Sequence, residues 1–278
     1  MGDALRLILD KACVSDDVAV VRKILTDNPT FDVNERLNGN GWTVLHYACH
    51  YGQHEIVSLL LGYPDINVNQ KTTYGSTPFN LGCYNGKVEA VKILLKDLRV
   101  DISMPDLLKW TPLTSASYRG KLQVIKWMIA SGRELTNFDL KGELFDEKFT
   151  AIEGAKRWGH TVVVSLLENL VAYPVQTRHE IRSHLGLAHA LAAELFSTVV
   201  FLCDDYLRIK KKSRKTNAAR FFDICSRLPM ELQMILCCRV HGSAKDIIPF
   251  EYTEAAFKSA PKKRCKLLNN PFGVGGWQ

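Results

Sequence analysis

The fold is decided by the stretch from Asn40 to Leu61, which reads NGWTVLHYACHYGQHEIVSLLL. A threonine near its start and a glycine near its middle both return along the chain at intervals of 34 residues: Thr43, Thr77 and Thr111; Gly52, Gly86 and Gly120. Because two independent markers share one period, the chain is built from a repeat of about 34 residues.

Both markers appear a fourth time after a longer interval. Thr150 and Gly159 each follow their predecessors by 39 residues, so an insertion of about five residues precedes this unit. An amino-terminal unit keeps the apolar positions of the pattern without the threonine box, as expected of a terminal repeat whose outer face meets water. The five predicted units are 4–34, 38–69, 72–103, 107–138 and 146–170.

This pattern resembles the ankyrin repeat. The family pattern, G-x-T-P-L-H-x-A-x-x-x-G-H-x-x-V-V-x-L-L followed by a strand like D-V-N, is met at nearly every position of residues 40–61 except Val44, where proline is usual. The resemblance implies an all-α solenoid of helix-turn-helix units with short hairpin loops. We expect the threonine to cap the first helix, the glycine to end it, and the strand-like tails 65–69 and 100–103 to lead into hairpin tips.

After residue 170 the pattern ends, and residues 171–278 indicate a second, helical domain behind the ankyrin domain of residues 1–170. Pro174 predicts a break, because a proline disfavours helical backbone in the residue before it. We expect one long helix over about 179–211, a basic loop at 208–215, helices over 218–227 and from 228 onward, and a loose tail from 269.

The charge of the chain is unevenly distributed. The formal net charge is +7, and two segments, 208–215 with six basic residues and 262–266 with four, account for more than that excess. Nucleic acid is not an expected partner, because no aromatic residues are interleaved with the basic run for base stacking. The run resembles a nuclear-import signal, although such runs are more often solvated loops: Lys210, Lys211, Lys212, Arg214 and Lys215.

The eight cysteines contain no C-x-x-C pair, and Cys49 and Cys83 occupy helix positions where ankyrin repeats usually carry alanine. We therefore interpret these two as small buried thiols. Without an apolar leader, the sequence favours a cytoplasmic or nuclear location. No membrane association is expected, since Glu194 lies near the centre of the apolar segment 185–203 and a carboxylate in mid-bilayer costs about 3 kcal/mol.

No catalytic motif is present, and an enzyme is not expected. The sequence lacks G-x-S-x-G, a P-loop, a dinucleotide fingerprint and H-E-x-x-H. His46, His50 and His54 are spaced like metal ligands. Gly52 ends the helix before His54, however, and zinc needs three or four converging ligands. We expect no metal and no cofactor, and a structural role for His46.

The resemblance also assigns positions to a protein partner. In ankyrin proteins, the residue before the threonine and the two residues before the glycine line the concave surface. Seven of those twelve positions are aromatic here, against 9% of the whole chain, and tryptophan, tyrosine and arginine dominate binding hot spots. With Tyr74 added, the predicted partner-binding residues are Trp42, His50, Tyr51, Tyr74, Tyr84, Trp110, Tyr118, Arg119, Phe149 and Trp158. Alternatively, several of these rings pack against neighbouring hairpins and contribute only stability.

One segment of the second domain, 228–238, resembles the opening of an F-box, L-P-x-E-[LI]-x-x-x-I-[LF]. Ankyrin repeats followed by such a segment are also the layout of poxvirus-type proteins with a PRANC domain. The resemblance implies a substrate adaptor that meets a Skp-type subunit of a cullin-RING ubiquitin ligase through Leu228, Pro229, Leu232, Ile235 and Leu236. Alternatives are that these residues form ordinary helical core, and that the chain is a structural scaffold.

Overall fold

The computed structural model describes residues 2–28, 31–135, 138–144, 147–203, 225, 228, 230–240, 252 and 256. The chain divides into two compact units, one of residues 1–131 and 135–172 and the other of residues 132–134 and 173–278. The first unit holds five successive helix pairs, and each overlaps one of the predicted repeat units. The expected all-α solenoid is thereby confirmed.

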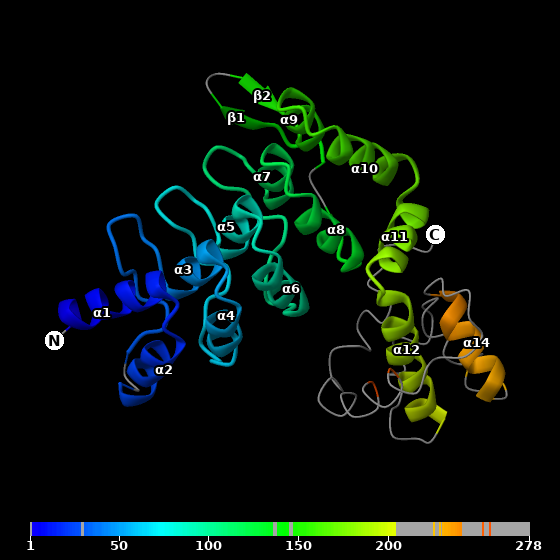
Figure 1. Ribbon diagram of the computed structural model, residues 1–278, viewed down its shortest axis with the longest axis horizontal. Helices are drawn as coiled ribbons and strands as arrows, with labels where there is room; N and C mark the ends of the chain where they lie inside the picture. The colour runs from blue at the N-terminus through cyan, green and yellow to red at the C-terminus, as the bar shows by residue number, and fades with distance from the viewer. Residues whose placement is uncertain are drawn as a thin grey trace, which may run out of the picture. The chain divides into compact units, whose positions relative to one another are not determined.

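The two helices of each pair belong to two stacks, which Figure 1 shows along the first unit. The inner stack consists of α1 (Gly2–Ser15), α3 (Val44–Tyr51), α5 (Pro78–Asn85), α7 (Pro112–Tyr118) and α9 (Ala151–Arg157). The outer stack consists of α2 (Val18–Asp27), α4 (His54–Leu61), α6 (Val88–Lys96), α8 (Leu122–Ala130) and α10 (Thr161–Ala172). Apolar side chains at helical spacing fill the space between the stacks: Ile56, Leu60, Val91, Leu94, Ile125, Met128, Val163 and Leu167.

The repeated threonines and glycines play the parts expected of them. Each threonine is the N-cap of its helix, and its side-chain oxygen accepts a hydrogen bond from the backbone nitrogen three residues later. All four glycines have left-handed backbone, with φ between 63° and 86° at Gly52, Gly86, Gly120 and Gly159. A residue with a side chain is strained there, so glycine lets the chain turn sharply into the second helix.

Neither tail expected to be strand-like forms a strand, so this prediction was wrong: residues 65–69 lie in turns and residues 100–103 in bends. An asparagine side chain of one repeat forms hydrogen bonds with the backbone groups of the tail in the next repeat. Asn69 Nδ2 donates to the Arg99 carbonyl at 2.7 Å, and its Oδ1 accepts from the Asp101 nitrogen at 2.7 Å. Asn34 makes the same two bonds one repeat earlier, to Asp65 and Asn67. Because the side chains satisfy these groups, no strand ladder is needed.

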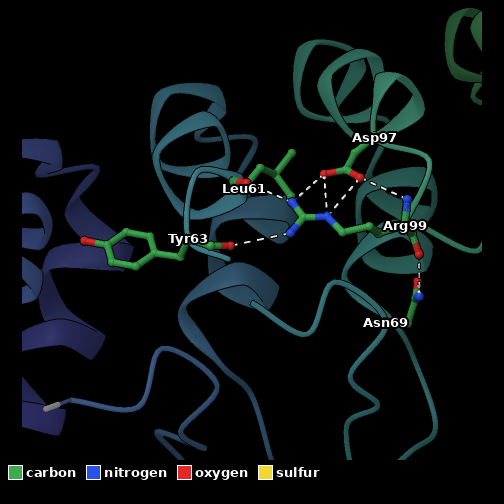
Figure 2. A network of polar contacts seen from close by, with 5 residues as sticks. All are labelled: Leu61, Tyr63, Asn69, Asp97 and Arg99. Atoms are coloured by element: carbon green, nitrogen blue, oxygen red, sulfur yellow. Dashed lines mark hydrogen bonds and ion pairs between the residues drawn. The ribbon is translucent and has the colours of Figure 1, made fainter. Parts of the chain in front are cut away.

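Arg99 joins the third repeat to the end of α4 (Figure 2). Its Nη2 atom donates to the Leu61 carbonyl at 2.8 Å, and its Nη1 atom reaches the Tyr63 carbonyl at 3.5 Å. Asp97 holds the guanidinium through its carboxylate at 2.6 Å. Since the last carbonyls of a helix have no partner within the helix, Arg99 both satisfies them and places a positive charge where the helix dipole favours one.

The insertion before the fifth unit forms a β-hairpin. Strands β1 (Gly142–Leu144) and β2 (Glu147–Phe149) pair antiparallel, with Gly142 opposite Phe149. The hairpin folds onto the fourth repeat. Trp110 Nε1 donates to the Glu143 carbonyl at 3.0 Å, and the Glu143 nitrogen donates to the Leu108 carbonyl at 2.8 Å.

The described part of the second unit contains α11 (Pro174–His184), α12 (Leu187–Cys203) and α14 (Met230–Val240). Pro174 starts α11, as its position predicts. The single helix expected over 179–211 is wrong, because Gly186, with φ of 68°, breaks it between α11 and α12. Helix α12 packs against α14 over a core that includes Phe196, Val199 and Cys237. Among the described residues, no helix has the length and apolar character to cross a membrane.

Candidate partner-binding surface

The predicted partner-binding residues come from equivalent places in successive repeats, namely the loop before each inner helix and the carboxyl end of that helix. Four rings of the second repeat form the first ring cluster: Trp42, Tyr47, His50 and Tyr51. Trp42 lies 4.9 Å from both Tyr47 and His50, measured between ring centroids, and His50 lies 4.9 Å from Tyr51. Edge-to-face geometry at these distances is favourable for aromatic pairs.

Four rings of the fourth and fifth repeats form the second ring cluster: Trp110, Tyr118, Phe149 and Trp158. Tyr118 is at its centre, with ring centroids 4.7 Å from Trp110, 5.1 Å from Trp158 and 6.2 Å from Phe149. Trp110 and Phe149 also meet at 5.5 Å. The ring contacts of this cluster therefore join the fourth repeat to the fifth.

The third repeat lies between the clusters and carries Ser76 where the second and fourth repeats have a tryptophan. Its ring is Tyr84, and the Arg119 guanidinium of the next repeat lies over it, 4.9 Å from the ring centroid. Asn85 Nδ2 is 3.0 Å from His50 Nδ1 and so connects this repeat to the first ring cluster. We call the two ring clusters together with Tyr84 and Arg119 the aromatic strip.

Exposure sorts the members of the aromatic strip into two kinds. Tyr51 and Trp158 are 42% and 52% exposed, whereas Trp110 and Phe149 are only 6% and 5% exposed. These two buried rings and Tyr47, which is also buried, support the others, and direct contact with a partner would fall to the exposed and half-buried ones. Tyr74, 65% exposed, stands apart at the tip of the third hairpin loop, where its carbonyl accepts from the Leu107 nitrogen at 3.1 Å.

The structure adds three residues that the sequence analysis did not single out. Lys87, Lys121 and His160 each follow a helix-ending glycine and lie over the glycine of the preceding repeat. A methyl group placed at Gly52 would come within 2.9 Å of Lys87 Cδ, and one at Gly86 within 2.7 Å of Lys121 Cδ. The spacing of 34 residues between Lys87 and Lys121 was the available signal.

Electrostatics ties Lys87 to the first ring cluster. Partial burial, and after it the positive charge of Lys87, lowers the pKa of His50. His50 is half-buried between Trp42 and Tyr51. Near neutral pH its ring is therefore held in the uncharged form, which suits its place among aromatic neighbours.

His46 has the structural role that its position predicts. It is fully buried, its Nδ1 accepts a hydrogen bond from the Thr43 nitrogen at 3.1 Å, and its Nε2 lies 3.3 Å from the Ser76 carbonyl of the next repeat. Burial lowers the pKa of His46 from 6.5 to about 4. Within the part of the chain that the structure describes, no three His, Cys, Asp or Glu side chains lie together as a metal site would require.

The buried thiols of the repeats are inert. Cys49 and Cys83 are fully buried and unpaired by disulfides, as their alanine-like positions predict. Burial raises the pKa of both thiols above the ordinary value of 9. The thiolate is the reactive form of cysteine, so these two contribute packing only.

The F-box-like residues are divided by the fold of the second unit. Leu232 is 46% exposed on α14, Ile235 is half-buried, and Leu236 packs against the core between α12 and α14. Gln233 Nε2 donates to the carbonyl of half-buried Leu228 at 2.8 Å. This bond connects the beginning of α14 to the backbone just before it. Pro229 and the import-like run 210–215 lie outside the described residues.

Comparison with known proteins identifies the repeats. Residues 9–106 match the family model described as ankyrin repeats, in three copies. The chain is also similar to a protein of Escherichia coli strain K12 described as a putative ankyrin repeat protein, YahD, with 39% identity over 67 residues. That alignment covers 24% of this chain and 32% of the bacterial protein, so the match spans about a third of that relative's length.

Proposed function

Since this chain is an ankyrin-repeat protein, we propose that it is a non-catalytic module that holds a protein partner on the concave surface of its repeats, along the aromatic strip. Ankyrin repeats indicate a protein-interaction module. The observation that carries the finer proposal is that exposed rings rest on less exposed ones: Tyr51 contacts buried Tyr47 and half-buried His50, and Trp158 contacts half-buried Tyr118. Rigid aromatic anchors of this kind supply contact area at low entropic cost.

The test is selection of peptides from a random phage-displayed library by the immobilised full chain. Peptides recovered by the unmodified protein should lose binding to the Tyr51→Ala, Trp158→Ala double variant by about 1,000-fold, since hot-spot rings contribute about 2 kcal/mol each. Because both rings are exposed, the melting temperature should change little. Tyr173→Ala, which removes an exposed tyrosine of the second unit, is the matched control and should bind normally.

The alternative, that the rings only pack, predicts another pattern. A large fall in melting temperature with peptide binding retained would contradict the proposal and favour a structural scaffold. Tyr118 is unsuited to the test, because it contacts three rings and its truncation would mix packing with binding.

A second candidate function, substrate adaptor of a cullin-RING ubiquitin ligase, is favoured by apolar side chains left exposed on α14. Met230 and Leu232 are 59% and 46% exposed. Calorimetric titration with a Skp-type adaptor tests it, with Leu232→Asp as the variant, because this side chain can change without disturbing the core that Leu236 helps to form. Binding that Leu232→Asp abolishes supports an adaptor. The absence of heat from a folded protein would remove this candidate.

A further inference from the structure

The aromatic strip carries a pattern of charge as well as of rings, and this pattern bears on what the partner is. We propose that the strip binds an extended acidic segment of a partner protein, in which carboxylates about three residues apart meet Lys87 at one repeat boundary and Lys121 with Arg119 at the next. The inference deepens the proposed function and rests on it.

The two lysines are held in fixed places. The stem of Lys87 lies against Gly52 and that of Lys121 against Gly86, so each lysine reaches back over the preceding repeat. Arg119 is held over the ring of Tyr84. Because these side chains are already ordered by contacts within the protein, an anion that met them would lose little of its affinity to side-chain ordering.

The positive charges of the strip are not used in ion pairs within the described part of the chain. Among the ion pairs formed by the described residues, none includes Lys87, Lys121 or Arg119. The acidic group closest to Lys87 in sequence is engaged elsewhere, since Glu89 pairs with Lys92 on α6. At the far end of the strip, Glu147 pairs with Arg157. Charge complementarity is thus left for a partner to supply.

The charges of the two lysines sit where they do not help the fold. Lys87 and Lys121 are the N-cap residues of α6 and α8, and neither forms a side-chain capping bond. A cation at the positive end of a helix is electrostatically unfavourable, and a cap without an acceptor leaves backbone amides unsatisfied. Two successive repeats therefore carry a lysine at an unfavourable position. A carboxylate of the partner, bound at each of these helix starts, would offset the unfavourable charge.

The spacing of the charges suits an extended chain. Neighbouring packed helices lie about 8 to 10 Å apart, and an extended chain advances about 3.3 to 3.6 Å per residue. One repeat therefore corresponds to about three residues of partner, and acidic side chains at positions i and i+3 would fall over successive boundaries. Residues between them would meet the exposed rings.

A protein segment fits the strip better than single-stranded nucleic acid does. Base stacking needs free ring faces, and one face each of Tyr51, Tyr84 and Tyr118 is taken by Tyr47, Arg119 and Phe149. Peptide side chains can pack against ring edges as well as faces. The experiment therefore measures binding of single-stranded RNA beside binding of peptides.

The experiment repeats the library selection with three forms of the full chain. These are the unmodified protein, the neutral variant Lys87→Met, Lys121→Met, and the reversed variant Lys87→Glu, Lys121→Glu. Methionine keeps an unbranched stem over each glycine and removes only the charge, so folding is preserved and checked by thermal melting. Recovered peptides are synthesised with a fluorescent label and titrated by anisotropy, beside a labelled twelve-nucleotide single-stranded RNA.

We expect the unmodified protein to recover peptides with Asp or Glu at positions i and i+3. Their affinity should fall about tenfold in the neutral variant and also with rising salt, and the reversed variant should select Lys and Arg instead. Peptides that need Tyr51 and Trp158 but show no acidic enrichment would overturn this inference and leave the proposed function standing. Tighter binding of the RNA would overturn it as well. If the folded protein recovers no peptide, the proposed function fails along with it.

Discussion

At the scale of single residues, the repeat pattern determined most of what could be predicted. Threonine caps and left-handed glycines follow from local backbone chemistry, which a sequence displays directly. The burial of Trp110 and Phe149 could not be predicted in this way. It depends on the inserted hairpin, which covers Trp110 and brings Phe149 against it.

His46 gives a prediction about pH. Its pKa is about 4 in the folded protein and 6.5 when unfolded, so its contribution to stability is complete above pH 6.5 and is lost as pH falls toward 4. His46→Asn should keep the bond to the Ser76 carbonyl, because Asn80 makes the equivalent bond to the Trp110 carbonyl one repeat later.

Urea unfolding at pH 7.5 and pH 5.0 measures the effect. The unmodified protein should lose about 2 kcal/mol more than His46→Asn between the two pH values, since the asparagine cannot take up a proton. Other titrating groups are common to both proteins and cancel in the difference. Equal losses in the two proteins would show that the histidine does not become protonated on unfolding.

At the scale of elements, the sequence indicated where helices occur better than where they break or what connects them. Helical spacing ran through residues 179–211, and only the left-handed backbone at Gly186 divides α11 from α12. A glycine within an apolar run is compatible with either outcome, and tertiary packing decides. The tails 65–69 and 100–103 had a strand-like composition, yet asparagine side chains from the preceding repeat hold their backbone in turns and bends.

Arg99 gives a prediction at this scale. Arg99→Ala removes the donor that satisfies the end of α4 and the guanidinium that pairs with the Asp97 carboxylate. We expect a loss of about 1 kcal/mol in the free energy of unfolding, moderated by partial exposure of the side chain. Arg99→Lys should restore only part of this, because one ammonium cannot reach two carbonyls and a carboxylate together.

Chemical denaturation of the two variants measures the difference. Arg22→Ala on the exposed face of α2 is the control and should change stability by less than about 0.5 kcal/mol. If Arg99→Ala proved as mild as the control, Arg99 would be a surface residue without a capping role.

At the scale of the whole molecule, the sequence predicted a linear array from its period, and stability in such an array is a sum over neighbours. The partner surface could be predicted only as a set of positions. Which rings are exposed, and which cations lie beside them, depends on side chains from adjacent repeats meeting, as Lys87 and Gly52 do. The second unit has no repeat pattern to guide prediction, and its core became evident only from the packing of α12 on α14.

The array predicts different outcomes for equal changes at its middle and its end. Leu94 is buried in α6, which packs against α4 and α8, whereas Leu25 is buried in α2, which has only α4 as an outer neighbour. Leu94→Ala should cost about 3 kcal/mol and speed hydrogen exchange in α4, α6 and α8 together. Leu25→Ala should speed exchange chiefly in α1 and α2. Exchange measured by mass spectrometry checks this, and uniform acceleration in both variants would mean that the repeats open as one unit.

The bonds between repeats have a consequence for how such a chain can grow. Asn69 reaches forward from the second repeat and Lys87 reaches back from the third, so the boundary between these two repeats is made of two halves encoded in different copies. A duplicated central segment would carry both halves and meet complementary ones on each side. Lengthening the array by gene duplication therefore requires no newly invented contact, and the binding surface would lengthen in step with it.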